Sequence, residues 1–171
     1  MKWWTKAAGL AVLLAGVGAA SLAAESGGID TIQAYAGTWK TETVHFDTPY
    51  SKAGKESSTL RNKCWKNGGF YACNQYVNGE SKALIVFTYN DKDKTYTTYP
   101  IPVDGGTAGT GKLLIEGNVW TYPWENIEQG KTTYFRVVNV FTAPGKIEYR
   151  QEFSTDKVKW MLMAKGTEVK E

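Results

Sequence analysis

The sequence predicts an all-β protein: a single antiparallel up-and-down barrel of about 8–10 strands, preceded by a short N-terminal helix. Three observations support this fold class. From residue 38 onward, apolar and polar residues alternate with the period of two that is typical of strands. Short turns rich in glycine, asparagine and aspartate separate these segments. The 171 residues suffice for one domain, and closing the sheet into a barrel removes its exposed edges.

Residues 1–23 have the composition of a secretory signal peptide. Lys2 and Lys6 supply a basic start, an uncharged apolar run follows, and Ala23 is a small residue of the kind found before a cleavage site. We expect cleavage after Ala23, with Ala24 as the alternative. A retained membrane anchor is the competing interpretation, although the apolar run is short for a spanning helix. The protein is therefore expected to be exported, either periplasmic or secreted, with no stable membrane span after cleavage.

The charge count argues against a nucleic-acid partner. The sequence has 20 Lys and Arg and 17 Asp and Glu, a net charge of +3. Cleavage removes Lys2 and Lys6 and no acidic residue, which leaves a net charge of +1. The remaining charges are scattered rather than clustered, so the mature chain lacks the basic surface expected of a nucleic-acid-binding protein.

Between the signal peptide and the strands, residues 24–36 are expected to form a polar tether and a short helix. Asp30 fits the N-cap of this helix and Gly37 fits its end. Residues 37–171 are expected to form the barrel domain. The expected strands are 38–46, 58–65, 70–77, 82–89, 95–101, 112–116, 119–125, 132–142, 146–154 and 158–165.

The two cysteines flank a predicted hairpin in the segment CWKNGGFYAC. If Gly68 and Gly69 form its two-residue turn, Cys64 lies opposite Cys73 on a non-hydrogen-bonded rung, where side chains approach most closely. This spacing is within disulfide range, and an oxidising compartment would preserve the bond. A metal site or a catalytic thiol is the alternative, but two cysteines and one distant histidine make a poor ligand set. We expect a disulfide, no metal and no cofactor.

The segment GGTAGTGKL, residues 105–113, is one residue short of a P-loop, the phosphate-binding loop of many nucleotide-binding proteins. Counted from Gly106, the glycine and lysine spacing fits, but Leu113 stands where magnesium requires a hydroxyl. The segment also lies between two predicted strands, whereas a P-loop is followed by a helix. No nucleotide is therefore expected, and the glycines are more simply explained by a loop that requires positive backbone angles.

The segment YAGTWKTE, with Gly37 and Trp39 at the start of the first strand, resembles the G-x-W signature of the lipocalin and calycin superfamily. The meander that follows is similar to that fold along nearly the whole mature chain, and most similar to exported bacterial lipocalin-like proteins of a domain-of-unknown-function family. The resemblance implies that Gly37 lets the chain enter the barrel and that Trp39 packs across its closed end. Family members usually place an arginine over this tryptophan, whereas the last strand expected here offers only Lys159 and Lys165.

The resemblance also implies a barrel that binds a small hydrophobic molecule, and Arg136 and Tyr134 are the expected polar anchor. Arginine among apolar neighbours is costly unless it meets an anion, and its planar fork suits a carboxylate. Fatty-acid-binding members of the superfamily hold a ligand carboxylate with arginine and tyrosine. The alternatives are an arginine in solvent or one paired with a protein acid. If Phe135 and Val137 point inward instead, Arg136 lies outside the barrel.

Aromatic side chains supply a candidate wall for the ligand site. Trp120, Tyr122 and Trp124 share one face of the predicted strand 119–125, where they can line a pocket or serve as ordinary barrel packing. Trp160 and Leu162 share a face of the last expected strand and are more consistent with the core.

We therefore expect an exported barrel that binds an unidentified small hydrophobic or amphipathic molecule, without catalysis. One alternative is a solid-cored envelope protein that acts through its surface in interactions or stress. The other is an enzyme with a site at the barrel mouth. A large internal cavity would favour the first hypothesis, and an exposed apolar patch without a cavity would favour the second. A perturbed pKa at His45, or at a buried acid that faces a cavity, would favour the third.

Overall fold

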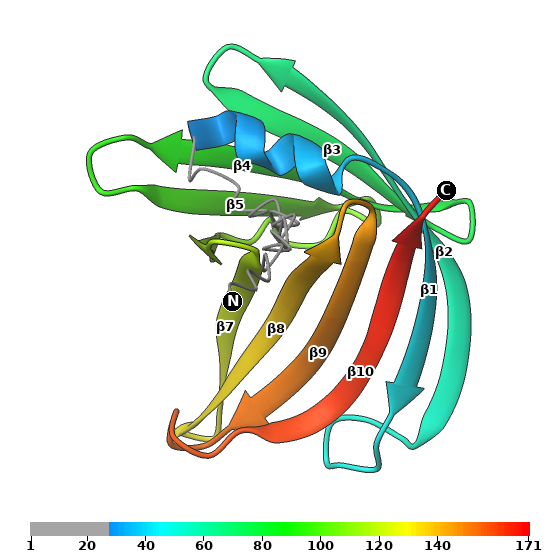
Figure 1. The fold of residues 1–171 in the computed structure, drawn as a ribbon. Helices are drawn as coiled ribbons and strands as arrows, with labels where there is room; N and C mark the ends of the chain where they lie inside the picture. The colour runs from blue at the N-terminus through cyan, green and yellow to red at the C-terminus, as the bar shows by residue number, and fades with distance from the viewer. Residues whose placement is uncertain (1–27) are drawn as a thin grey trace, which may run out of the picture.

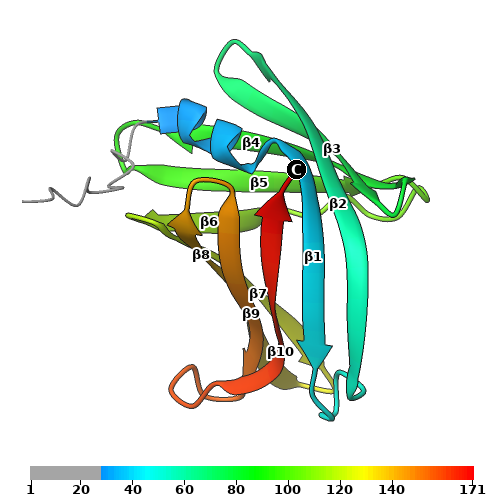
Figure 2. The same cartoon turned by 45° about the vertical axis from the view of Figure 1, so that its right-hand side comes forward.

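The computed structural model describes residues 28–171, which form a closed barrel of ten antiparallel strands. Each strand pairs with the next one along the chain, and the first strand also pairs with the last. The predicted up-and-down barrel with a short N-terminal helix is thus confirmed (Figure 1 and Figure 2). The predicted signal peptide and its cleavage site after Ala23 lie outside the described residues.

Successive strands run between two ends of the barrel, which we call the helix end and the loop end. Odd-numbered strands run from the helix end to the loop end, and even-numbered strands return. The elements are η1 (Gly28–Tyr35), β1 (Gly37–His45), β2 (Gly54–Asn67), β3 (Phe70–Val77), β4 (Glu80–Asn90), β5 (Thr95–Pro102), β6 (Gly111–Glu116), β7 (Val119–Glu128), β8 (Lys131–Ala143), β9 (Lys146–Ser154) and β10 (Met161–Lys170). The loop end carries the connections 46–53 and 155–160.

Two-residue turns set the register of several hairpins, and the turn between β3 and β4 shows the cause. Asn78 has φ 51° and Gly79 has φ 84°. Two successive positive φ values define a type I′ turn, whose twist matches that of the flanking strands. Asparagine and glycine tolerate this conformation best, so the turn predicted at this pair is confirmed.

The last strand begins and ends later than predicted. We expected residues 158–165, but β10 runs from Met161 to Lys170. The loop before it is longer because the Asp156 carboxylate accepts hydrogen bonds from the backbone amides of Val158 and Lys159, both at 2.8 Å. These local bonds offer the backbone an alternative to strand pairing.

A β-bulge between Leu162 and Ala164 then changes which side chains of β10 face inward. The expectation that Trp160 and Leu162 fill the core is therefore wrong. Leu162 lies opposite Glu152 in the register, and Trp160 precedes the strand, with the Arg136 guanidinium 3.9 Å from its ring centroid. Ala164 is the fully buried residue in this part of β10.

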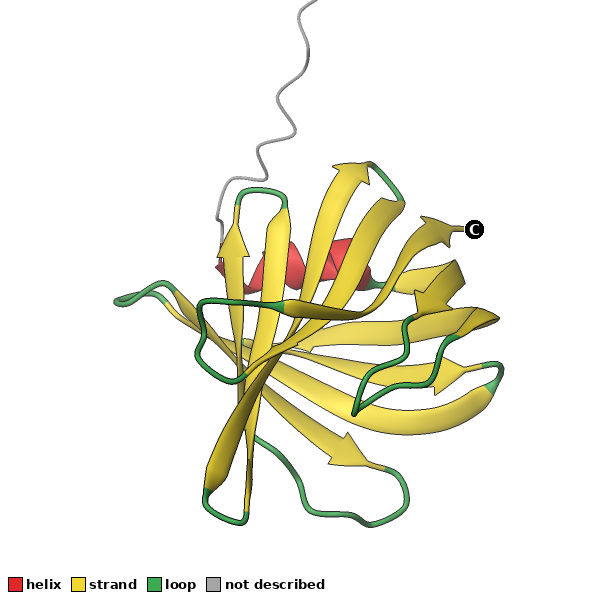
Figure 3. Cartoon of the chain, turned by 90° about the horizontal axis from the view of Figure 1, so that it is seen from below, coloured by secondary structure: helices red, strands yellow, loops and turns green. Residues whose placement is uncertain are grey.

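Helix η1 is a 3₁₀ helix that closes the helix end of the barrel, and it lies behind the strands when the molecule is viewed from below (Figure 3). It packs against β3 and β4, and Ile32 is fully buried among aromatic side chains of the barrel.

Contrary to the prediction, Asp30 is not the N-cap of helix η1. It lies within the helix and forms an ion pair with Lys66 of β2, with Nζ–Oδ1 at 2.8 Å. No helix within residues 28–171 is long and apolar enough to cross a membrane.

The predicted disulfide is confirmed. Cys64 of β2 and Cys73 of β3 are directly opposite in the register, and their sulfurs are 2.13 Å apart. Cys73 is 1% exposed and belongs to the core cluster that contains Ile32. The bond therefore joins the hairpin in the region that helix η1 covers.

The G-x-W segment forms a compact arrangement with the C-terminal strand. Trp39 is fully buried, and its indole Nε1 donates a hydrogen bond to the Tyr35 carbonyl at 3.1 Å. The ammonium of Lys170 lies 5.3 Å from the Trp39 ring centroid. Lys170 belongs to the part of β10 beyond the predicted strand, which explains why only Lys159 and Lys165 were expected as candidates for this contact.

Candidate functional site: a cavity inside the barrel

A cavity of about 490 Å³ occupies the barrel interior. This volume lies within the range of about 300–1,000 Å³ that is typical of small-molecule sites. Apolar wall residues are Leu60, Val77, Ile85, Phe87, Pro100 and Val137. Polar wall residues with uncharged hydroxyl or amide side chains are Thr41, Thr43, Ser58, Gln75, Thr98, Asn139 and Gln151. The wall is therefore amphipathic, which a solid hydrophobic core would not be.

Several of these polar side chains bond to one another. Thr41 Oγ1 is 2.6 Å from Ser58 Oγ across the β1–β2 pair, so one of the two hydroxyls donates to the other. The hydroxyl of Tyr149 on β9 is likewise hydrogen-bonded to Thr43 Oγ1 on β1. These pairs satisfy each other and give the wall a fixed shape. The groups left without partners are consequently the ones that matter for a ligand.

Glu168 of β10 is the principal unpaired group in the cavity wall. It is 7% exposed, and its buried Oε2 has no hydrogen-bond partner among the described residues. Burial raises the pKa of this carboxyl from 4.5 to about 7, because the charged form loses hydration that no protein donor replaces. Glu168 can therefore exchange a proton near neutral pH.

Two tyrosines share the environment of Glu168. Tyr122 of β7 has a buried hydroxyl that also lacks a partner among the described residues. Burial first, and the nearby Glu168 second, raise the pKa values of Tyr122 and Tyr35. Both phenols therefore remain neutral, and the Tyr122 oxygen and the Glu168 carboxyl offer unused hydrogen-bonding capacity in the same part of the wall.

The cavity reaches solvent toward the loop end of the barrel. His45 of β1 and Glu56 of β2 border it there, with His45 Nε2 3.4 Å from Glu56 Oε2. Their side chains are 29% and 58% exposed, in contrast to the buried Glu168. The interior thus has an exposed polar rim and a buried polar end.

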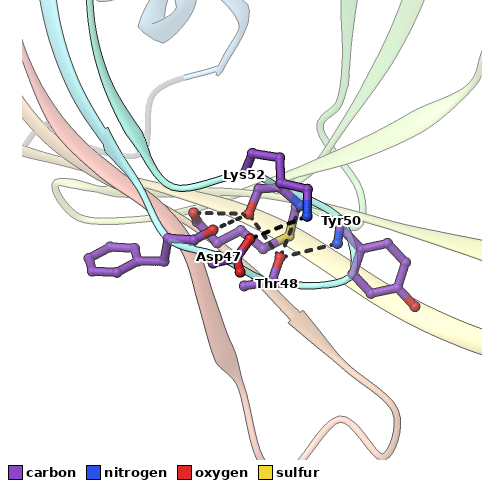
Figure 4. A network of polar contacts seen from close by, with 7 residues as sticks. Asp47, Thr48, Tyr50 and Lys52 are labelled. Carbon is purple, nitrogen blue, oxygen red and sulfur yellow. Dashed lines mark hydrogen bonds and ion pairs between the residues drawn. The ribbon is translucent and has the colours of Figure 1, made fainter.

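The connection 46–53 lies at this rim and is held by its own side chains (Figure 4). Thr48 Oγ1 accepts hydrogen bonds from the amides of Tyr50 and Ser51 at 3.1 and 3.0 Å. Lys52 Nζ forms an ion pair with Asp47 at 3.5 Å. Figure 4 shows that the Tyr50 ring points away from this network.

Tyr50 instead joins aromatic residues at the loop end of β8 and β9. Its ring is edge-on to Phe135 and Phe153, with centroid distances of 5.0 and 4.9 Å. Phe135 also stacks on Trp124 at 5.4 Å. The connection 46–53 is therefore anchored across the loop end by an aromatic cluster.

The expected inward orientation of Arg136 and Tyr134 is wrong. Val137 and Asn139 line the cavity, so the alternate residues of β8 face outward. Arg136 Nε donates to Glu152 Oε2 at 2.6 Å, and Arg150 Nε donates to the other oxygen of this carboxylate at 2.9 Å. A protein acid thus satisfies Arg136, which was one of the alternatives left open by the sequence.

The three aromatic residues of β7 occupy different surroundings. Trp120 is 2% exposed in the core cluster at the helix end, and Tyr122 lines the cavity. Trp124 is 48% exposed and, with Tyr134, lines a second hollow of about 900 Å³ on the barrel wall. Of the five predicted ligand residues, only Tyr122 contacts the internal cavity.

Sequence reasoning missed Glu168, Tyr149 and Asn139 as cavity residues. A signal for both Tyr149 and Asn139 existed in the sequence, because Asn139 alternates with Val137 and Phe141, and Tyr149 alternates with Ile147 and shares its face with Phe153, all of which are apolar. Glu168 lay beyond the predicted end of the last strand, so its inward position had no basis in the expected alternation.

The glycine-rich segment 105–113 leads into strand β6, as expected, rather than into a helix. Across the described part of the chain, no three His, Cys, Asp or Glu side chains gather in a way that could hold a metal ion.

The fold and the cavity define a class of protein: a small closed β-barrel with an amphipathic internal cavity. No protein-family model and no curated protein matches this sequence. The likeness to lipocalins therefore depends on the G-x-W segment and on the barrel itself, which are compatible with a lipocalin-like binding protein.

Proposed function

We propose that this protein is an exported, lipocalin-like barrel that binds a small amphipathic molecule in its internal cavity. The observation that carries the proposal is the cavity of about 490 Å³ with an apolar wall and unpaired polar groups at one end. Filling this volume with side chains would stabilise a purely structural barrel, because empty space in a core is destabilising.

Native mass spectrometry of the protein purified after exported expression tests the proposal. We expect a discrete additional mass that organic extraction removes.

Uptake of the fluorescent apolar probe N-phenyl-1-naphthylamine gives a second measurement. Val137→Trp places an indole in the cavity and should abolish probe fluorescence, whereas Val169→Trp adds the same indole at a position that is 49% exposed and should not. Equal probe binding by both variants and the wild type would show that the cavity is not the site.

Export is supported by the basic and apolar N-terminal segment and by the Cys64–Cys73 disulfide, a bond that persists in oxidising compartments. The mature N-terminus tests it. We expect the exported chain to begin at Ala24, or at Glu25 if the alternative site is used. Recovery of the chain only in the cytoplasm with Met1 intact would contradict export.

Glu168 gives one observation in favour of a second candidate function, catalysis inside the barrel. A carboxyl with a pKa of about 7 that faces a cavity is suited to general acid–base chemistry. If this function is correct, a released cargo that is returned to the protein should be recovered chemically changed, and Glu168→Gln should prevent the change. Recovery of unchanged cargo would leave binding as the function.

A further inference from the structure

We propose that the bound molecule is a cationic amphipath whose amine is held at Glu168 inside the barrel, while its apolar part fills the rest of the cavity. This inference rests on the proposed function and specifies the ligand chemistry. It differs from the carboxylate ligand that the sequence predicted through Arg136.

The charges of the wall favour a cation over an anion. Glu168 and Glu56 are the acidic residues of the cavity wall, and no lysine or arginine is among the described residues that line it. A ligand carboxylate would meet like charge at Glu168, and no cationic side chain among the described wall residues would compensate it. The cationic groups Arg136 and Arg150 are on the outer surface and already share Glu152.

The unpaired atoms favour an amine over a neutral alcohol. An ammonium group has three hydrogen-bond donors and no acceptor. The Oε2 atom of Glu168 and the Tyr122 hydroxyl oxygen are buried and unpartnered, and both can accept a hydrogen bond. An unpaired buried carboxylate is strongly destabilising, so an opposite charge compensates it better than a single hydroxyl does.

Aromatic rings strengthen this preference. Tyr35 from η1, Tyr122 from β7 and Tyr149 from β9 line the cavity with Glu168. The Glu168 carboxyl contributes to the raised pKa of each of these three phenols, which is consistent with their shared position on the cavity wall. Aromatic faces attract ammonium groups, most strongly where water is excluded.

Isothermal titration with three probes of equal chain length tests the inference: n-octylamine, n-octanol and octanoate. We expect n-octylamine to bind at least about tenfold more tightly than n-octanol, and octanoate to bind most weakly. Glu168→Gln preserves size and should lower n-octylamine affinity by about tenfold or more without changing n-octanol affinity. Glu148→Gln makes the same charge change on an exposed side chain and should leave all three affinities unchanged.

The pH dependence of binding gives an independent readout with the wild-type protein. The ammonium binds the carboxylate form of Glu168, so n-octylamine affinity should rise from about pH 5.5 to about pH 8. The other titratable groups of the cavity are Tyr35, Tyr122 and Tyr149, which line it together with Glu168, and His45 and Glu56, which border its exposed rim. A rise that persists in Glu168→Gln would assign the effect to the rim and overturn the proposal.

The possible outcomes separate the two proposals. Equal binding of n-octylamine and n-octanol, or n-octylamine binding that Glu168→Gln does not weaken, overturns the amine assignment and leaves cavity binding intact. Binding of none of the three probes, together with the absence of an extractable cargo, overturns both.

Discussion

Tyr149 of β9 lies across Gly166 of β10, and its hydroxyl bonds to Thr43 of β1 on the far side of that strand. A Cβ atom at position 166 would collide first with the backbone carbonyl oxygen of Glu42 on β1, and it would also be 2.8 Å from both Cε1 and the hydroxyl oxygen of Tyr149. Glycine at 166 therefore allows one tyrosine to bridge β9 and β1 across the strand that closes the barrel.

The first prediction is that Gly166→Ala destabilises the protein by roughly 1–3 kcal/mol, the cost of forcing an additional atom into a packed interior. The collision with the Glu42 carbonyl forces β10 to shift from β1, because moving the Tyr149 ring alone does not relieve it. The shift also disturbs the bond between Tyr149 and Thr43. Urea unfolding followed by tryptophan fluorescence measures the loss.

Gly54→Ala is the matched control for this substitution. Gly54 lies at the start of β2, has no positive φ, and a Cβ atom there would have nothing within 4 Å. Its stability should change by no more than about 0.5 kcal/mol. Equal stability of the two variants would show that the close approach of Glu42 and Tyr149 to position 166 has no energetic importance.

The orientation of strand β8 shows what the sequence could and could not predict. Alternation and turn residues predicted the barrel, because these patterns act over a few neighbouring residues. They did not decide which face of β8 points inward, since Tyr134 and Phe135 are both aromatic and Arg136 has apolar neighbours on either face. That choice depends on Glu152 of β9, which satisfies Arg136 outside the barrel.

Glu168 could not be predicted for a different reason. The local bonds of Asp156 lengthen the loop before β10, and the bulge between Leu162 and Ala164 resets the alternation. Both features move the strand toward the C-terminus and place Glu168 and Lys170 within it. The Cys64–Cys73 bond was predictable because a two-residue turn determines the opposed pairs without any knowledge of the rest of the barrel.

The second prediction concerns the pH dependence of stability. The folded pKa of Glu168 is about 7 and its ordinary value is 4.5, so the folded state favours the protonated form. Its contribution is fully present below about pH 4.5 and is lost as the pH rises through about 7. The free energy of unfolding should therefore fall over this interval by roughly 3 kcal/mol.

Glu168→Gln should remove this component, since glutamine cannot ionise. The measurement is the difference in unfolding free energy between variant and wild type at several pH values, because contributions from the other groups cancel in the difference. We expect the variant to be the more stable form above pH 7. A difference that does not change with pH would show that Glu168 has the same pKa in the folded and unfolded chains.

The third prediction is that the disulfide stabilises the protein by roughly 2–3 kcal/mol, as expected for a bond that closes a short loop in the unfolded chain. The two cysteines are nine positions apart. Guanidinium unfolding with and without a thiol reductant measures the contribution. The double variant Cys64→Ala, Cys73→Ala should match the reduced wild type and lose its sensitivity to reductant. Quantitative thiol labelling of the unfolded, unreduced protein would contradict the bond itself.

The fourth prediction concerns Lys170, whose ammonium lies over Trp39 and whose stem lies beside Gly37. Lys170→Met keeps an apolar stem but removes the charge, and should cost roughly 0.5–1 kcal/mol through the lost cation–π interaction. Lys170→Ala also removes the stem and should cost more, because long side chains cover apolar surface with their methylene groups. Lys165→Met is the control and should be nearly neutral, because Lys165 is on the same strand and is also exposed, but its ammonium lies over no aromatic ring of the described residues. Urea unfolding of the three variants orders these effects. Suppose that Lys170→Met is as stable as Lys165→Met, whereas Lys170→Ala is less stable. The methylene stem of Lys170, and not its charge, then stabilises the packing on Trp39. In that case Lys170 is not a cationic counterpart of the arginine that lipocalins usually place over this tryptophan.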